Sequence, residues 1–246
     1  MAETWILESS VAFGDVDADN LLTLQGVFQL LQEAAIAHAN QHDTGTDAMI
    51  TRGESWVLNR VAVEISRYPG YGERVRVETW SSGIRGFKGY RDFRVFDAAG
   101  QVIVAGSSLW LYVSVRTHAI IRVPRQIAER FPVAAEGVFC PDIESLGLPA
   151  PEPDGALSCA LSLRYSDFDA NAHLNNTAYL DLLQAALARH GLNPRPRSVH
   201  IKYGKAIPAR TPAAEVRLDP APVGPDQPVR FSIHAGPDTC AQGEVG

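Results

Sequence analysis

The chain has 246 residues, of which 46% are hydrophobic, so it can form one large domain or two domains of about 120 residues each. Its net charge of −6, from 22 basic and 28 acidic residues, argues against nucleic acid as the main partner, because phosphate binding needs a basic field. The three cysteines lie in no CxxC spacing and no apolar run approaches the ~20 residues of a membrane span, which favours a cytoplasmic protein that does not insert into membranes.

The N-terminal half is predicted to be a helix followed by an antiparallel sheet. Hydrophobic residues recur at helical spacing from Val27 towards His38. Later segments instead alternate between apolar and polar residues, as strands with one buried face do. These segments are 56–65, 74–80 and the two arms of a hairpin over 90–115.

The C-terminal half is predicted to repeat this order after a linker. Residues 132–157 are dense in Pro, Gly and acidic residues and have no sustained period, which is typical of a linker. Beyond it we expect a strand, a polar run, a helix to about His190 and three more strands. The predicted strands are 161–166, 198–203, 214–218 and 229–234. The predicted domains are therefore 1–131 and 158–246, joined by the linker 132–157.

Two stretches of the chain align without a gap. Residues 15–32 read DVDADNLLTLQGVFQLLQ and residues 167–184 read DFDANAHLNNTAYLDLLQ, an offset of 152 residues (167 − 15). The shared Asp-x-Asp-Ala ahead of both helices favours a duplication over chance similarity between amphipathic helices. One central helix against a curved antiparallel sheet, made twice, is an α+β arrangement. We expect two tandem hot dog domains, in which each sheet wraps its helix and the two units pair within one chain.

The second copy carries more reactive groups than the first. Asp169, Asn171 and His173 alternate in sequence, so in an extended segment they would project to the same side. A carboxylate, an amide and an imidazole together can activate water and move protons, which favours hydrolysis of an activated acyl group. Asp and Asn are also common capping and turn residues, but the first copy has Asp19 and Leu21 in place of Asn171 and His173. We therefore interpret the shared aspartates as structural and the unshared residues as functional, with Asp169 serving both purposes.

The start of the second helix is a candidate oxyanion site. A helix N-terminus has unpaired backbone N–H groups and an effective charge of about +0.5, which polarises a carbonyl oxygen placed there. Asn175, Asn176 and Thr177 lie around this start, and Asn176 is the expected N-cap. A calcium loop is disfavoured, because the glycine at its sixth position and the closing glutamate are absent.

The stretch DFDANAHLNNTAYL resembles the DxNxHxNNxxY signature of the acyl-ACP thioesterase family, a family of tandem hot dog enzymes. The segments RYPGYGERVRVETW and YRDF extend the resemblance through the first domain. The resemblance implies hydrolysis of fatty acyl-acyl carrier protein (acyl-ACP) in fatty acid biosynthesis, without metal or bound cofactor. By matching positions it implies that Asp169, Asn171 and His173 are catalytic. It also implies that the acyl tail lies in the N-terminal domain, for which the candidate lining residues are Val27, Phe28 and Leu31.

The chain departs from the family pattern at one position. Plant members carry a glutamate followed by cysteine after a YRR-like stretch, whereas this chain reads YGKAI, with Ala206 and Ile207 there. This leaves Asp169 as the main base or nucleophile. Because acyl carrier protein is acidic, we expect a local basic surface for it, and solubilising surface charge is the alternative explanation of the same residues. The candidates are Lys202, Lys205 and Arg210, with Arg195 and Arg197 nearby.

Two other functions remain open from the sequence, and a third is disfavoured. An acyl-CoA thioesterase would use the same site, and a non-catalytic acyl-binding or regulatory protein would keep the pocket without turnover. A hot dog dehydratase is disfavoured, because the helix from Asn176 lacks the histidine, glycine and proline pattern of that chemistry. The assembly is expected to be a monomer with pseudo-dimeric domains or a homodimer.

Overall fold

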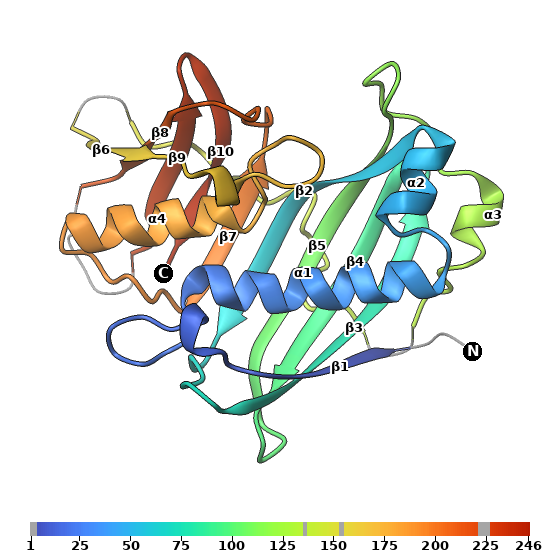
Figure 1. The fold of residues 1–246 in the computed structure, drawn as a ribbon, viewed down its shortest axis with the longest axis horizontal. Helices are drawn as coiled ribbons and strands as arrows, with labels where there is room; N and C mark the ends of the chain where they lie inside the picture. Colours follow the sequence, from blue (N-terminus) through green and yellow to red (C-terminus); the bar gives the residue numbers. More distant parts are fainter. Residues whose placement is uncertain (1–3, 135–136, 153–154, 221–226) are drawn as a thin grey trace.

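The structure is a computed structural model that describes residues 4–134, 137–152, 155–220 and 227–246. Within these residues ten strands form one antiparallel sheet, and two long helices lie on the same face of it (Figure 1). The helices are α1 (Leu24–Gln41), α2 (Thr46–Arg52), α3 (Arg125–Ala128) and α4 (Ala178–Arg189). The strands are β1 (Trp5–Ser10), β2 (Glu54–Ile65), β3 (Arg74–Arg85), β4 (Lys88–Phe96), β5 (Val102–Ser114), β6 (Leu157–Ser162), β7 (Ser198–Tyr203), β8 (Ala213–Leu218), β9 (Val229–Ala235) and β10 (Asp238–Val245).

The strand order has an internal two-fold symmetry that matches the sequence repeat. The sheet runs β1-β3-β4-β5-β2 in the first half and β7-β10-β9-β8-β6 in the second, so the second order is the first one reversed. The halves join where β2 pairs with β7, from Arg60 opposite Lys202 to Glu64 opposite Ser198. The predicted pair of hot dog units within one chain is confirmed.

Most of the predicted strands are confirmed, because their alternating residues bury one face. The apolar residues of β7 and β8 point towards α4, and those of β3 and β4 towards α1. The predicted strand over 161–166 is wrong except at Leu161 and Ser162, since β6 runs over Leu157–Ser162 and Tyr165–Asp167 is a 3-10 turn. The elements β1, β10, α2 and α3 were not predicted. The sequence of β10, DTCAQGEV, has little alternation, and its position depends on pairing with both β7 and β9.

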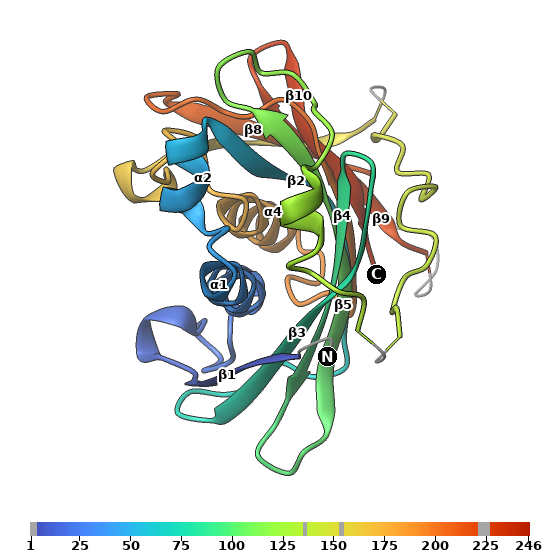
Figure 2. The same ribbon diagram turned by 90° about the vertical axis from the view of Figure 1, so that its right-hand side faces the viewer.

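The described part of the linker lies on the outer face of the first half of the sheet, opposite α1 (Figure 2). The Phe139 N–H donates to Asp92 Oδ1 at 2.8 Å, and the Cys140 N–H donates to Ser107 Oγ at 2.9 Å. Further along, Arg60 Nη1 donates to the Leu146 carbonyl at 2.7 Å. These bonds hold the linker against the outer face of the sheet, so these linker residues do not cover the face on which α1 and α4 lie.

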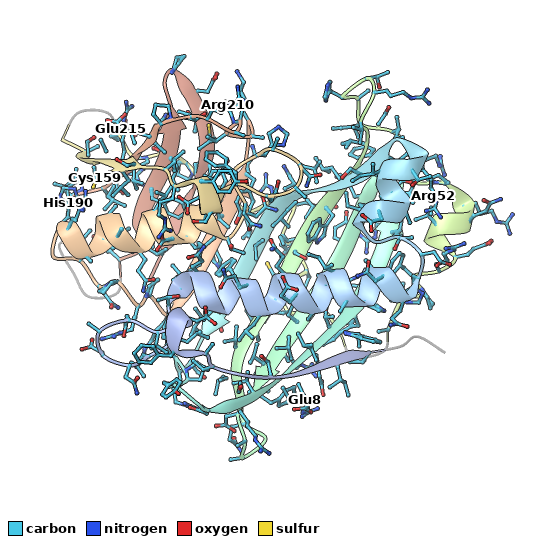
Figure 3. The ribbon with its side chains drawn as sticks, viewed as in Figure 1. Glu8, Arg52, Cys159, His190, Arg210 and Glu215 are labelled. Carbon is cyan, nitrogen blue, oxygen red and sulfur yellow. The ribbon has the colours of Figure 1, made fainter. Side chains whose placement is uncertain are left out.

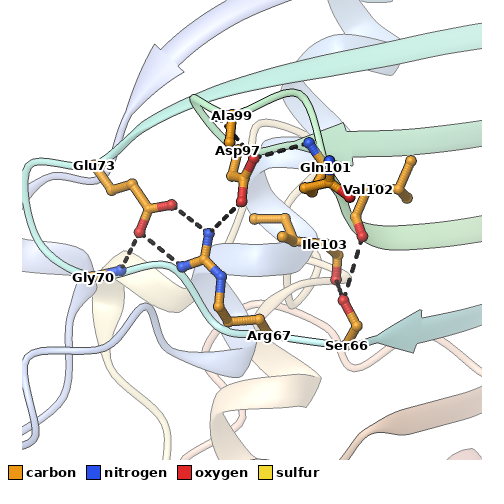
Figure 4. Close-up of polar contacts among 9 residues, drawn as sticks. All are labelled: Ser66, Arg67, Gly70, Glu73, Asp97, Ala99, Gln101, Val102 and Ile103. Carbon is orange, nitrogen blue, oxygen red and sulfur yellow. Dashed lines mark hydrogen bonds and ion pairs between the residues drawn. The ribbon is translucent and has the colours of Figure 1, made fainter.

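Arg67 joins two loops at the edge of the first half through ion pairs with Glu73 and Asp97 (Figure 4). Arg67, just after β2, donates to Glu73 Oε2 at 2.9 Å and to Asp97 Oδ2 at 3.1 Å. The Asp97 carboxylate also accepts from the Gln101 N–H. This bond, with the bond from Arg67, lowers the pKa of Asp97 against the opposing effect of burial. The β2–β3 connection and the β4–β5 turn are thereby tied to each other.

Among the described residues, no helix is long and apolar enough to cross a membrane.

Candidate active site

The polar run before α4 forms a tight loop. The Asp169 N–H donates to the His173 carbonyl at 2.8 Å, and the Asn171 N–H donates to Asp169 Oδ1 at 2.8 Å. Ala172 has a left-handed backbone with φ of 58°, which reverses the chain. The prediction that residues 169–173 are extended is therefore wrong, since alternation places side chains on one side only in a strand.

The first copy folds into the same loop but neutralises its carboxylates. The Asp17 N–H donates to the Leu21 carbonyl at 2.8 Å, and Asn20 has φ of 64°. Arg195 Nη1 lies 2.8 Å from Asp17 Oδ2, and its Nη2 lies 2.7 Å from Asp19 Oδ2. These bonds, the one to Asp19 first, raise the pKa of Arg195. Asp17 is therefore bound to a cation from the other half, as expected of a structural aspartate.

Asp169 uses one carboxylate oxygen in the same way as Asp17 does. Its Oδ1 closes the turn, as Asp17 Oδ1 does by accepting from the Asp19 N–H. Among the described residues, Asp169 Oδ2 has no hydrogen-bond or ion-pair partner. One oxygen of Asp169 therefore supports the loop while the other is available to a ligand.

The side chain of Asn175 closes the turn just before α4. Its Oδ1 accepts from the N–H and from the hydroxyl of Thr177, each at 2.9 Å. The expectation that Asn176 is the N-cap is wrong, since α4 begins at Ala178 and Thr177 holds the N-cap position. The Asn176 carbonyl instead accepts from the Tyr203 hydroxyl at 3.0 Å, which orients the helix start on β7. The Asn176 N–H has no hydrogen-bond partner among the described residues.

An apolar cavity of about 360 Å³ opens between α1, the first half of the sheet and this loop. At the end near α4 its wall is polar and contains Asp169, Asn171, Asn175, Asn176 and Gln32. Away from α4 its lining is mainly hydrophobic, with Ala35, Ile36, Ala39, Met49, Ile50, Trp56, Ile84, Trp110, Val115 and Phe131. The cavity thus joins reactive groups of the second half to an apolar space in the first half.

Several predicted residues lie elsewhere in the described structure. Val27, Phe28 and Leu31 are buried in the main core and are not among the residues that line the cavity. His173 is exposed, and its side chain is not among the lining residues either. Its backbone bridges Pro208, which follows β7. The structure therefore brings together Asp169, Asn171, Asn175 and Asn176, while His173 lies on the outside of the same loop.

The residues of α1 that line the cavity were missed from the sequence, which named Val27, Phe28 and Leu31 on the same helix instead. Gln32, Ala35 and Ala39 line the cavity one helical turn after another. Gln32 does stand out in the sequence, since it matches Gln184 in the repeat. Nothing in the sequence places it against the other domain, because that contact joins residues about 150 positions apart.

One buried cation lies in the cavity wall. Arg91 on β4 is 9% exposed, and its Nη1 lies 2.9 Å from His38 Nδ1 and 3.0 Å from Thr79 Oγ1. Burial lowers the pKa of Arg91 to about 10 against the opposing effect of Asp92. Burial, then Arg91 and His42, lower the pKa of His38 to about 3, so a neutral His38 ring accepts from the arginine near neutral pH.

A second cavity, of about 400 Å³, adjoins the first. It lies between α1, the end of β1 and the start of α4, and Gln32 and Asn175 line both cavities. Its other lining residues are mostly polar and include Ser9, Ser10, Asp15, Gln25, Gln29, Glu33, Ser166 and Asp167. Gln32 and Asn175 thus stand where a polar space meets an apolar one.

The predicted carrier-protein residues do not form one cluster around the loop. Lys202 is exposed on β7, whose neighbours Ile201 and Tyr203 are buried, so it lies on the sheet face opposite the helices. Lys205 is paired with Asp238 at 2.6 Å. Arg210 follows Pro208 and is exposed above the second half (Figure 3).

No metal centre is formed within the described ranges, since no three His, Cys, Asp or Glu side chains gather in a group that would hold an ion. The cysteines Cys140, Cys159 and Cys240 are unpaired thiols, and burial raises the pKa of Cys140 and of Cys240.

Solved structures share this fold across nearly the whole chain. The 12:0-ACP thioesterase from Umbellularia californica superposes with a TM-score of 0.84 at 21% identity, covering 98% of this chain and 96% of that one. A putative oleoyl thioesterase from Lactobacillus plantarum superposes with a TM-score of 0.84 at 21% identity, covering 99% and 95%.

Sequence relatives point the same way. The palmitoyl-acyl carrier protein thioesterase of Arabidopsis thaliana is 27% identical over 183 residues, which are 70% of this chain and 44% of that protein. The dodecanoyl-(acyl-carrier-protein) hydrolase of Cinnamomum camphora is 31% identical over 179 residues, 68% of this chain and 46% of that protein. The chain thus spans less than half the length of these relatives.

The family models cover both halves of the chain. The model of the acyl-ACP thioesterase N-terminal domain matches residues 4–131, and the model of the C-terminal domain matches residues 152–211. The matched ranges contain α1 with its cavity-lining face and the loop with α4. The chain therefore belongs to the acyl-ACP thioesterase family.

Proposed function

We propose that this chain hydrolyses the thioester between a fatty acyl group and the phosphopantetheine arm of acyl carrier protein, and so releases free fatty acid for lipid synthesis. The observation that carries the proposal is the cavity, which has Asp169, Asn171 and the residues just before α4, Asn175 and Asn176, at one end and an apolar lining beyond. A fatty acyl thioester has the same division, with a reactive polar group at one end of a hydrocarbon chain.

The proposed reaction uses Asp169 as the base. Its free Oδ2 takes a proton from water, and the water oxygen attacks the thioester carbonyl carbon. The carbonyl electron pair moves onto oxygen beside the α4 N-terminus and returns as the C–S bond breaks. The protonated Asp169 then gives this proton to the thiolate, which yields a carboxylic acid and a thiol and restores the carboxylate. Asn171, on the same loop, is placed to hold the water, and His173 is proposed as a proton carrier at the outside of the loop.

The acyl chain is proposed to occupy the apolar cavity. The lining residues of α1 and of the sheet take the role that the sequence assigned to Val27, Phe28 and Leu31, because those three side chains are packed in the core. Burying a hydrocarbon chain there removes apolar surface from water and supplies binding free energy of about 25 cal/mol per Å².

Acyl carrier protein is the proposed partner. It is acidic, so basic side chains near the loop would favour its approach. Arg210 is the best placed of the three candidates, since it lies two residues after Pro208, which bridges His173. Lys205, already paired with Asp238, and Lys202, on the other sheet face, are the weaker candidates.

The proposal is tested by incubating the chain with acyl-ACPs of several chain lengths and, separately, with the matching acyl-CoAs, while free thiol is measured. We expect thiol release from acyl-ACP that exceeds release from acyl-CoA. Faster release from acyl-CoA would make the chain an acyl-CoA thioesterase instead. Tight binding of acyl-ACP with no thiol released would show a non-catalytic acyl-binding protein. Ala206, which stands where plant members of the family carry a glutamate, is the reason to test for that result.

A further inference from the structure

The two-fold symmetry places a glutamine of each long helix opposite the start of the other. Gln184 on α4 accepts through Oε1 from the Leu24 N–H, at 3.0 Å, where α1 begins. The repeat offset of 152 residues relates Gln184 to Gln32 and Leu24 to Asn176. The symmetry thus relates the bond between Gln184 and Leu24 to the pair of Gln32, on α1, and Asn176, which lies two residues before α4. Both residues line the apolar cavity, together with Asp169 and Asn171.

The two glutamines differ in how they are held. Gln184 is fixed at both ends of its carboxamide, since its Nε2 also donates to the Pro194 carbonyl at 3.0 Å. The counterpart of Pro194 is His42, whose carbonyl accepts from Arg130 at 2.6 Å. Among the described residues, neither the Gln32 carboxamide nor the Asn176 N–H has a hydrogen-bond partner.

Gln32 also lies at the boundary between two different environments. It lines the apolar cavity on one side and the polar cavity on the other. A half-buried carboxamide without a protein partner at such a boundary is available to bond a ligand that enters the cavity. A thioester carbonyl has a single polar oxygen, which two converging N–H groups can satisfy.

We propose that Gln32 is a catalytic residue of this site, contributed by the N-terminal half. The proposal rests on the proposed thioesterase function. Gln32 Nε2 and the Asn176 N–H donate together to the thioester carbonyl oxygen. As water attacks the carbon and Asp169 takes its proton, the electron pair moves onto this oxygen and both donors hold the resulting oxyanion. The pair then re-forms the carbonyl, the C–S bond breaks, and the thiolate sulfur receives the proton.

In the first copy the equivalent backbone N–H and carboxylate are already paired within the protein. Gln184 satisfies the Leu24 N–H, and Arg195 pairs with Asp17. An oxyanion donor and a carboxylate are thus both occupied by residues of the protein. This makes Gln184 a matched control for Gln32, because it has the same chemistry in a position where it caps a helix.

The experiment compares Gln32→Ala, Gln32→Glu and Gln184→Ala with the wild type, using dodecanoyl-ACP as the substrate. Loss of one oxyanion donor lowers kcat by about 10²–10³-fold, so we expect that loss for Gln32→Ala with little change in KM or Tm. Gln32→Glu keeps the size of the side chain and removes the Nε2 donor, so it should lose kcat equally. Gln184→Ala should lower Tm, because it leaves the Leu24 N–H unpaired, while kcat stays close to that of the wild type.

The possible results separate this inference from the proposed function. A wild-type chain that releases no thiol from acyl-ACP would overturn both. Turnover in the wild type with an unchanged kcat in Gln32→Ala would overturn only the role of Gln32. Full activity in Gln32→Glu would do the same, because a side chain that only packs there tolerates the exchange. A fall in Tm of Gln32→Ala that accounts for its lost activity would show a structural role.

Discussion

Two aspartates at equivalent positions have different surroundings, and this difference decides what each can do. Asp17 and Asp169 both accept from a backbone N–H two residues ahead through Oδ1. The second oxygen of Asp17 is bound by Arg195, whereas the second oxygen of Asp169, a residue that lines the apolar cavity, has no partner in the described chain. Sequence comparison alone cannot separate them, because both stand in the same Asp-x-Asp-Ala pattern.

A pair of matched substitutions tests this division. Asp169→Asn keeps the turn-closing oxygen and removes the base, so kcat should fall by about 10²–10⁴-fold while Tm changes little. Asp17→Asn removes the charge that pairs with Arg195, so it should lower the free energy of unfolding by about 1–3 kcal/mol and leave kcat intact. Thiol release and urea unfolding measure the two effects. A large loss of kcat in a stably folded Asp17→Asn variant would contradict the assignment.

At the scale of elements, α1 serves two purposes along its length. Its first turns bury Leu24, Val27 and Phe28 in the core, and later positions present small side chains to the cavity. Gln32 and Ala39 are seven residues apart, which corresponds to about 10 Å along a helix. The helix thus carries a polar group at the reactive end of the cavity and an alanine in its apolar lining.

Enlarging that alanine should shorten the usable cavity. Ala39→Leu adds three carbon atoms to the wall, so we expect kcat/KM to shift from myristoyl-ACP towards octanoyl-ACP. Ala37→Leu is the control, because Ala37 lies on the same helix outside the set of lining residues. The measured quantity is the ratio of kcat/KM for the two substrates. An equal shift in both variants would indicate a general effect on α1 rather than a change in cavity depth.

The docking of α1 on β4 should make stability depend on pH. Burial, Arg91 and His42 lower the pKa of His38 from the ordinary histidine value of 6.5 to about 3. The unfolded chain therefore binds a proton between these values that the folded chain refuses. The contribution of His38 is fully present above pH 6.5 and is lost as the pH falls towards 3.

This dependence can be measured by urea unfolding at several pH values below 6.5. One proton accounts for a slope of up to about 1.4 kcal/mol per pH unit. His38→Gln keeps an acceptor for Arg91 and cannot be protonated, so its free energy of unfolding should fall less steeply with decreasing pH. Equal slopes in the two proteins would rule out His38 as the source.

At the scale of the whole molecule, the two halves form one folding unit. They share the β2–β7 pairing, and the Tyr68 hydroxyl donates to the Pro196 carbonyl at 2.7 Å. The bond from Leu24 to Gln184 adds a contact between the helices. Separating the halves would expose the backbone groups of β2 and β7 as open sheet edges.

We therefore expect a single unfolding transition. All four tryptophans, at positions 5, 56, 80 and 110, lie in the first half, so tryptophan fluorescence reports that half alone. Far-UV circular dichroism reports both halves. The midpoints of the two signals in a urea titration should coincide. Circular dichroism that persists after the fluorescence transition would show that the second half unfolds separately.

The sequence by itself determined the elements that depend on local pattern and repetition. Alternation placed β2, β3, β7, β8 and β9, because a strand with one buried face must alternate. The gapless repeat predicted the two-fold arrangement, and the polar run located the loop of Asp169. The strands β1 and β10 were not predicted, because β1 pairs with β3 and β10 with β7, both far away in the sequence.

The tertiary structure alone decided which of the candidate groups meet. The left-handed backbone at Ala172 turns His173 away from the cavity that Asp169 and Asn171 line. The packing of α1 against α4 brings Gln32 to the start of α4 and leaves Val27 in the core. The helix packing depends on contacts between residues about 150 positions apart, and a local pattern carries no information about such contacts. The turn at Ala172 is local, but a non-glycine residue with a left-handed backbone is not marked by the alternating pattern around it.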